Sequence, residues 1–154
     1  MWVLIGVGFV IAGVVGVWLQ RRTGRPLPPP APIATAKRSF GRLAALDLVG
    51  AGEPAKHVAV SVDILRVYLA MRNGEASQGL TSSELAQVLA DDGAVPVHRV
   101  SELLQTADAI KFSEQSVDGP SAERLAGEAA AIVSEVHRAD THHSSARQSR
   151  KKKK

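Results

Sequence analysis

The side chains of this 154-residue sequence that could do chemistry include two adjacent pairs of hydroxyl or carboxylate groups, Ser82-Ser83 and Asp91-Asp92. A nucleophilic hydroxyl needs a base beside it, and a metal site needs carboxylates at ligand spacing. The sequence contains no nucleophile elbow, no His-Glu-x-x-His, no glycine-rich phosphate loop and no aspartate-rich metal loop. We therefore interpret the two pairs as a helix start and a helix end, and expect no enzyme, no catalytic residue, no metal ligand and no cofactor.

The histidines are the other candidate ligands. His142-His143 lies in a segment that we expect to be disordered, where metal can bind adventitiously but a built site is not expected. His57, His98 and His137 are scattered along the chain and are interpreted as helix-surface residues. The sequence has no cysteine, which excludes disulfides, thiolate metal sites and a cysteine nucleophile, and which fits a reducing compartment.

An uncharged apolar run covers residues 2–19 and is followed directly by Gln20, Arg21 and Arg22. A helix of this length rises about 27 Å, close to the thickness of a bilayer core. Trp2 and Trp18 stand at the two ends, where indole rings favour the headgroup boundary. A cleaved signal peptide would carry positive charge before the run and a small-residue cleavage site after it, and neither is present. We therefore expect a retained transmembrane anchor.

Within the run, Gly8, Ala12 and Gly16 recur every four residues, a spacing that permits close helix packing and self-association, although glycine is common in membrane helices generally.

The positive charges near this run predict its direction. The positive-inside rule predicts a single-pass protein with its N-terminus outside and the rest of the chain in the cytoplasm. The basic residues behind this prediction all follow the run: Arg21, Arg22, Arg25, Lys37, Arg38 and Arg42.

The composition divides the remaining chain into three parts after an anchor over residues 1–20. Residues 21–36 are rich in proline, which favours extended polyproline II, and we interpret them as a semi-rigid linker rather than as an SH3-type or WW-type ligand. Residues 37–137 have helical apolar spacing throughout, which predicts an all-α domain of four to five helices. Residues 138–154 form a basic tail that we expect to be disordered.

Five segments carry the helical spacing of that domain. Thr81 followed by Glu84 has the spacing of a capping box, so a helix should begin there. The residues after Asp108 read as a short extended piece in which Ile110 and Phe112 cover the bundle. The segments lie at about 43–49, 54–72, 81–92, 96–108 and 118–137, and their apolar stripes predict a core of Leu65, Leu69, Leu85, Leu103, Leu104 and Ile132, with Asp63 and Arg66 pointing elsewhere.

Three short segments carry a resemblance to a known family. Leu-Arg-Val-Tyr-Leu at 65–69, Leu-Thr-Ser-Ser-Glu-Leu at 80–85 and Asp-Ala-Ile-Lys-Phe at 108–112, followed by a final helix, resemble the C-terminal cytoplasmic helical region of BatD-type (Bat aerotolerance) membrane proteins. The similarity covers about residues 40–137. In that family the region follows a transmembrane helix, and the proteins are associated with MoxR-type AAA ATPases and von Willebrand A domain proteins. The resemblance implies partners of those classes; no large export domain precedes the apolar run here, so that domain's role is not carried over.

Charge is partitioned sharply along the chain. Residues 43–137 have a net charge of −8, whereas residues 20–42 and 138–154 have +6 each. An acidic domain of this kind repels phosphate, so we do not expect the helix-turn-helix-like stretch from Thr81 to Phe112 to bind DNA. The basic tail can attract anionic lipid at about 1 kcal/mol per basic residue, or it can simply be solvated. Its lipid-contact or anion-contact candidates are Arg147, Arg150, Lys151, Lys152, Lys153 and Lys154.

Taken together, these features predict a membrane-anchored, non-catalytic interaction module that acts as an accessory subunit of a membrane protein complex. Its expected partners are the membrane, a protein in that complex and anionic lipid. The alternative is a membrane-tethered regulator that binds nucleic acid through its basic arms, which the acidic domain disfavours.

Topology provides the first test. We expect reporter fusions at the C-terminus to be active only with cytoplasmic reporters, because all the arginines near the apolar run follow it. Cleavage of the 43–137 region by protease added to the outer face of intact cells would contradict the predicted orientation.

Overall fold

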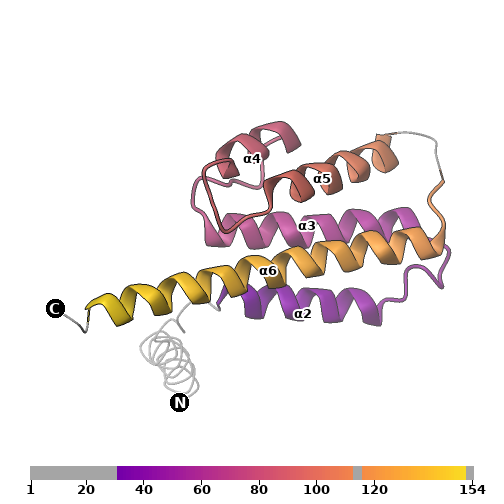
Figure 1. Ribbon diagram of the computed structural model, residues 1–154. Helices are drawn as coiled ribbons and strands as arrows, with labels where there is room; N and C mark the ends of the chain where they lie inside the picture. Colours follow the sequence, from indigo (N-terminus) through magenta and orange to yellow (C-terminus); the bar gives the residue numbers. More distant parts are fainter. Residues whose placement is uncertain (1–30, 113–115, 152–154) are drawn as a thin grey trace, which may run out of the picture. The chain divides into compact units, whose positions relative to one another are not determined.

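The computed structural model describes residues 31–112 and 116–151, and every regular element in these ranges is a helix (Figure 1). The expected all-α class is therefore confirmed for this part of the chain. None of the described helices has the length and apolarity to cross a membrane. The expected span at 2–19 lies outside the described residues. The helices are α2 (Pro32–Ala45), α3 (Pro54–Arg72), α4 (Ser82–Leu89), α5 (Val97–Phe112) and α6 (Gly119–Lys151).

Helix α3 is the centre of the bundle and packs against α2, α5 and α6, while α4 packs against α5 (Figure 1). Its bounds are those predicted from the sequence. The predicted stripe is buried, and α3 also buries Ser61, Ile64 and Tyr68 along one flank of it. The Ser61 hydroxyl donates to the carbonyl oxygen of His57 at 2.7 Å, so this buried polar group is satisfied within the helix.

Helix α4 begins as the capping-box prediction requires. The backbone N–H of Glu84 donates to Thr81 Oγ1 at 3.3 Å, and the backbone N–H of Thr81 donates to Glu84 Oε2 at 2.8 Å. This arrangement satisfies two N–H groups at the helix start. The helix ends at Leu89, before the predicted Asp92-Gly93, and in the turn that follows the Asp92 carboxylate accepts from the backbone N–H of Ala94.

The predicted linker is wrong at its C-terminal end, and so is the predicted first helix. Residues 32–36 are the first turn of α2, because Pro32 occupies a position where a missing N–H costs nothing. Ala36 and Leu43 are buried, and Ile33 packs against the core, so tertiary packing extends the helix. The helix ends at Ala45, and residues 46–52 form turns in which Asp47 Oδ1 accepts from the backbone N–H of Gly50.

Helix α5 does not stop near Asp108 but continues to Phe112. The predicted extended piece is therefore helical. Ile110 packs against the core as expected, whereas Phe112 is 79% exposed and does not cover the bundle. Two residues apart on a helix, these side chains point about 200° apart, so both cannot face inward.

Helix α6 also exceeds its prediction, because the expected disordered tail from residue 138 is helical as far as Lys151. At 33 residues the helix is about 50 Å long. Among the residues of α6 up to 145, whose burial the structure describes, the last fully buried one is Val136, and one turn later Asp140 is bound by Arg72 of α3 at 2.6 Å. This long-range ion pair fixes the helix beyond the apolar core.

All six predicted core residues are buried, with Leu65, Leu69, Leu104 and Ile132 at 0% exposure. We predict that Leu65→Ala lowers the free energy of unfolding by about 2–5 kcal/mol, because the cavity cannot collapse in a close-packed bundle. Thermal or urea unfolding of a fragment covering residues 31–151 measures this. Leu46→Ala is the matched control, since Leu46 is 63% exposed and its truncation should cost little. Equal losses for both variants would contradict the assignment.

Candidate functional site

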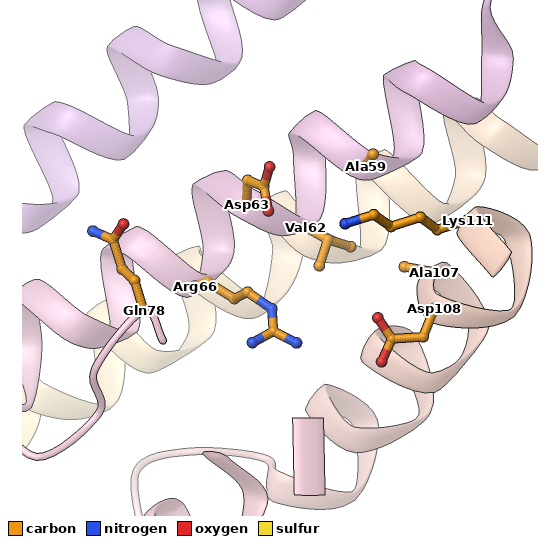
Figure 2. A pocket seen from close by; sticks show the side chains of 8 residues that line it. All are labelled: Ala59, Val62, Asp63, Arg66, Gln78, Ala107, Asp108 and Lys111. Carbon is orange, nitrogen blue, oxygen red and sulfur yellow. The ribbon is translucent and has the colours of Figure 1, made fainter. Parts of the chain in front are cut away.

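A polar cavity lies between α3, α5 and the loop that joins α3 to α4, and has a volume of about 250 Å³ (Figure 2). Both charged and apolar side chains line it. The cavity is open to solvent and smaller than most sites for drug-sized ligands. Its lining residues are Ala59, Val62, Asp63, Arg66, Gln78, Ala107, Asp108 and Lys111.

Arg66 is held in place at the inner side of this cavity. Its Nη1 donates to the Leu80 carbonyl oxygen at 2.9 Å, and its Nη2 donates to Ser82 Oγ at 2.7 Å. The Ser82 hydroxyl donates in turn to Asp108 Oδ2 at 2.6 Å. This chain of partly buried hydrogen bonds joins α3, the start of α4 and α5. It fixes the Arg66 guanidinium without neutralising it by a direct ion pair.

Asp63 and Lys111 lie at the exposed side of the cavity. Figure 2 shows the Lys111 side chain reaching from α5 toward α3. Its Nζ lies 5.4 Å from the centre of the Phe112 ring, within the range of a cation–π contact. Neither Asp63 nor Lys111 forms an ion pair with any residue that the structure describes.

Sequence reasoning missed this site. It placed Asp63 and Arg66 off the apolar stripe, which is correct, but gave them no role. Their spacing of three residues, and that of Asp108 and Lys111, puts each pair on one helix face. That signal is common on solvated helices, and only the packing of α3 against α5 distinguishes it.

A second polar cluster lies at the C-terminal end of α3. The Arg72 guanidinium binds Asp92, after α4, and Asp140 of α6. The hydrogen bonds to Asp140 and Asp92 raise the pKa of Arg72 above its ordinary range, and Arg72 in turn lowers the pKa of Asp92. Burial raises the pKa of the neighbouring Tyr68 hydroxyl. Because every charge here is paired, we interpret this cluster as structural.

The predicted helix-end pairs are placed as follows. Ser82 is the first residue of α4, as predicted, but its hydroxyl also bridges Arg66 and Asp108. Asp91 is exposed, and Asp92 binds Arg72 after α4 has ended. The Ser82 hydroxyl therefore holds Arg66 and Asp108 in place beside the cavity. The residues that line the cavity include no histidine.

The histidines do not gather into one site. His57 is partly buried with no hydrogen-bond partner for its Nδ1, and His98 lies 3.3 Å from Glu102 on the exposed face of α5. The prediction that His142-His143 lies in a disordered segment is wrong, because both residues are part of α6. Their side chains are exposed, as is that of His137. Within the described ranges, no three His, Cys, Asp or Glu residues are grouped as a metal site requires.

The predicted membrane residues are mostly outside the described part of the chain. Arg147, Arg150 and Lys151 belong to the last turns of α6, so the backbone there is helical. Their contact with lipid stays a prediction. The anchor residues Trp2, Gly8, Ala12, Gly16, Trp18, Arg21 and Arg22, and the tail residues Lys152, Lys153 and Lys154, lie outside the described residues.

Comparison of the chain with protein-family models, with curated proteins and with solved structures found no match in any of the three. The similarity to the BatD-type region stays a prediction based on its short segments. The arrangement at the cavity therefore has to be interpreted from its own geometry, which suits the binding of a polar ligand.

The Arg72 cluster gives a test of what holds α6. We predict that Arg72→Gln lowers the free energy of unfolding by about 1–3 kcal/mol, because it leaves two partly buried carboxylates unpaired. Urea unfolding measures the loss. Arg99→Gln is the matched control: Arg99 also binds two carboxylates, Glu128 and Glu135, but its side chain is 40% exposed, so its loss should be clearly smaller.

The same cluster predicts a pH dependence. Because Arg72 lowers the pKa of Asp92 in the folded state below its usual 3.8, the unfolded state binds this proton more readily. The stabilisation is present above that usual value and is lost as the pH falls through the lowered one. The difference in stability between the parent protein and Arg72→Gln should therefore shrink below about pH 4. A difference that stays constant down to pH 2 would contradict this linkage.

Proposed function

We propose that this protein is a membrane-anchored, non-catalytic interaction module, an accessory subunit that docks a protein of a membrane complex at the cytoplasmic face. The apolar run at 2–19 and the arginines after it support the anchor. The compact helical domain over residues 31–151 supports the docking role, because it offers a stable surface and a polar cavity.

The observation that carries this proposal is that three arginines are used in contacts inside the domain, whereas several carboxylates are exposed and unpaired. Arg66, Arg72 and Arg99 are all used in contacts between helices. In contrast, several exposed carboxylates form no ion pair with any described residue. These unpaired carboxylates agree with the net charge of −8 over residues 43–137, which favours a basic or mixed-charge partner. These carboxylates include Glu75, Asp91 and Glu123.

The basic flanks support an orientation relative to the membrane. Lys37, Arg38 and Arg42 are exposed on α2, the first described helix. Basic residues near an anionic leaflet are attracted by about 1 kcal/mol each and lose this attraction as salt rises. With the basic tail, they would hold the domain near the lipid while the acidic surface is left for a protein.

The resemblance to the BatD-type region adds a partner class to the proposal. MoxR-type AAA ATPases and von Willebrand A domain proteins would then supply the chemistry of the complex. This part rests on the resemblance alone, and a partner of another class would leave the docking role unchanged.

The proposal predicts that neutralising the exposed carboxylates weakens partner binding. The partner should be captured by photo-crosslinking in native membranes and identified by mass spectrometry, and its affinity then measured with purified proteins. We expect the combined variant Glu75→Gln, Asp91→Asn, Glu123→Gln to lose at least about tenfold in affinity, and the affinity of the parent to fall as salt rises.

The matched control is a chain that ends after Ser145. It keeps Asp140 and its ion pair with Arg72 but removes the basic end of α6. We expect it to bind the partner as the parent does. Loss of binding on this truncation, together with binding of nucleic acid by the full chain, would replace the docking role with the nucleic-acid alternative.

A further inference from the structure

The cavity between α3 and α5 brings together four charged groups that do not pair with one another. Asp63 and Arg66 come from α3, and Asp108 and Lys111 come from α5, so each helix supplies one charge of each sign (Figure 2). None of the ion pairs among the described residues, all with N···O distances within 4.0 Å, involves any of them.

The hydrogen bonds around the cavity explain why two of these charges stay apart. The Arg66 guanidinium is turned toward Leu80 and Ser82, and Asp108 accepts from Ser82, so one hydroxyl separates the two charges. Lys111 and Asp63 lie at the exposed side, where water screens them. The protein thus holds two cationic and two anionic groups around one space of about 250 Å³.

The lining selects among ligand classes by charge. An anion would be drawn to Arg66 and Lys111 but repelled by both carboxylates, and a cation would face the reverse. A molecule with one charge of each sign can satisfy both sets through charge-assisted hydrogen bonds. Ala59, Val62 and Ala107 form the apolar part of the lining, which suits a short aliphatic group.

We propose that this cavity is a binding site for a small zwitterion of the α-amino acid class with an aliphatic side chain. Its carboxylate binds Arg66 and Lys111, its ammonium group binds Asp63 and Asp108, and its side chain contacts the apolar residues. The site is separate from the acidic docking role, because it requires a dipolar ligand of low mass rather than a basic protein.

The test uses the full chain in detergent, titrated with L-alanine and L-valine and followed by calorimetry or by amide chemical shifts. Each amino acid has two analogues that carry one charge: propionate and ethylammonium for alanine, and 3-methylbutanoate and isobutylammonium for valine. We expect at least one amino acid to bind at least about tenfold more tightly than both of its analogues, since each lost charged contact costs about this factor. Failure of both amino acids to bind, or equal binding of an analogue, would overturn the proposal.

Variants of the exposed pair test the location. Lys111→Gln and Asp63→Asn should each weaken the binding of that amino acid by about tenfold, with an unchanged melting temperature, because both side chains are exposed. Lys37→Gln is the matched control, since Lys37 is exposed on α2 and does not line the cavity. Unchanged affinity in both cavity variants, or an equal loss in the control, would show that the ligand binds elsewhere and would reject this site.

Discussion

The burial of α3 is the constraint on which the rest of the described domain depends. A helix that packs against three others has little surface left for solvent, so its buried and partly buried polar side chains need hydrogen-bond partners within the protein. Ser61 is satisfied within the helix, Arg66 by the start of α4, and Arg72 by Asp92 and Asp140. The hydrogen bonds and ion pairs of Arg66 and Arg72 fix the positions of α4, the loop after it and the end of α6. The apolar core supplies the stabilising free energy, whereas the arginines determine which elements meet.

This arrangement also explains how one small domain can be rigid inside and acidic outside. Guanidinium groups can bridge two elements with several donors at once, as Arg66, Arg72 and Arg99 do in this domain. Exposed carboxylates such as Glu75, Asp91 and Glu123 form no ion pair with any described residue, and the cavity beside Arg66 keeps both signs of charge in reach of solvent. Structural requirements and a surface suited to binding thus arise from the same residues.

Local patterns predicted the all-α class, both ends of α3, the start of α4 and the core leucines, because caps and apolar spacing act within a few residues. The errors come from contacts that are distant in sequence. The first turn of α2 looked like linker because Pro32 follows a proline-rich stretch, and packing decides otherwise. The tail looked disordered because it is polar, yet Asp140 is held by a residue 68 positions earlier. The cavity requires α3 and α5 to be neighbours, which neither helix encodes alone.

The uninterrupted course of α6 has a mechanical consequence. An α-helix resists bending far more than a coil does, so a pull or tilt applied at its far end passes to the bundle as torque rather than being absorbed by slack chain. Residues 141–145 are exposed and should open and reclose locally, while those around Ile132 open only with the whole domain. The length of α6 that can transmit force to the bundle therefore depends on how many of its last turns stay helical beyond the ion pair between Asp140 and Arg72.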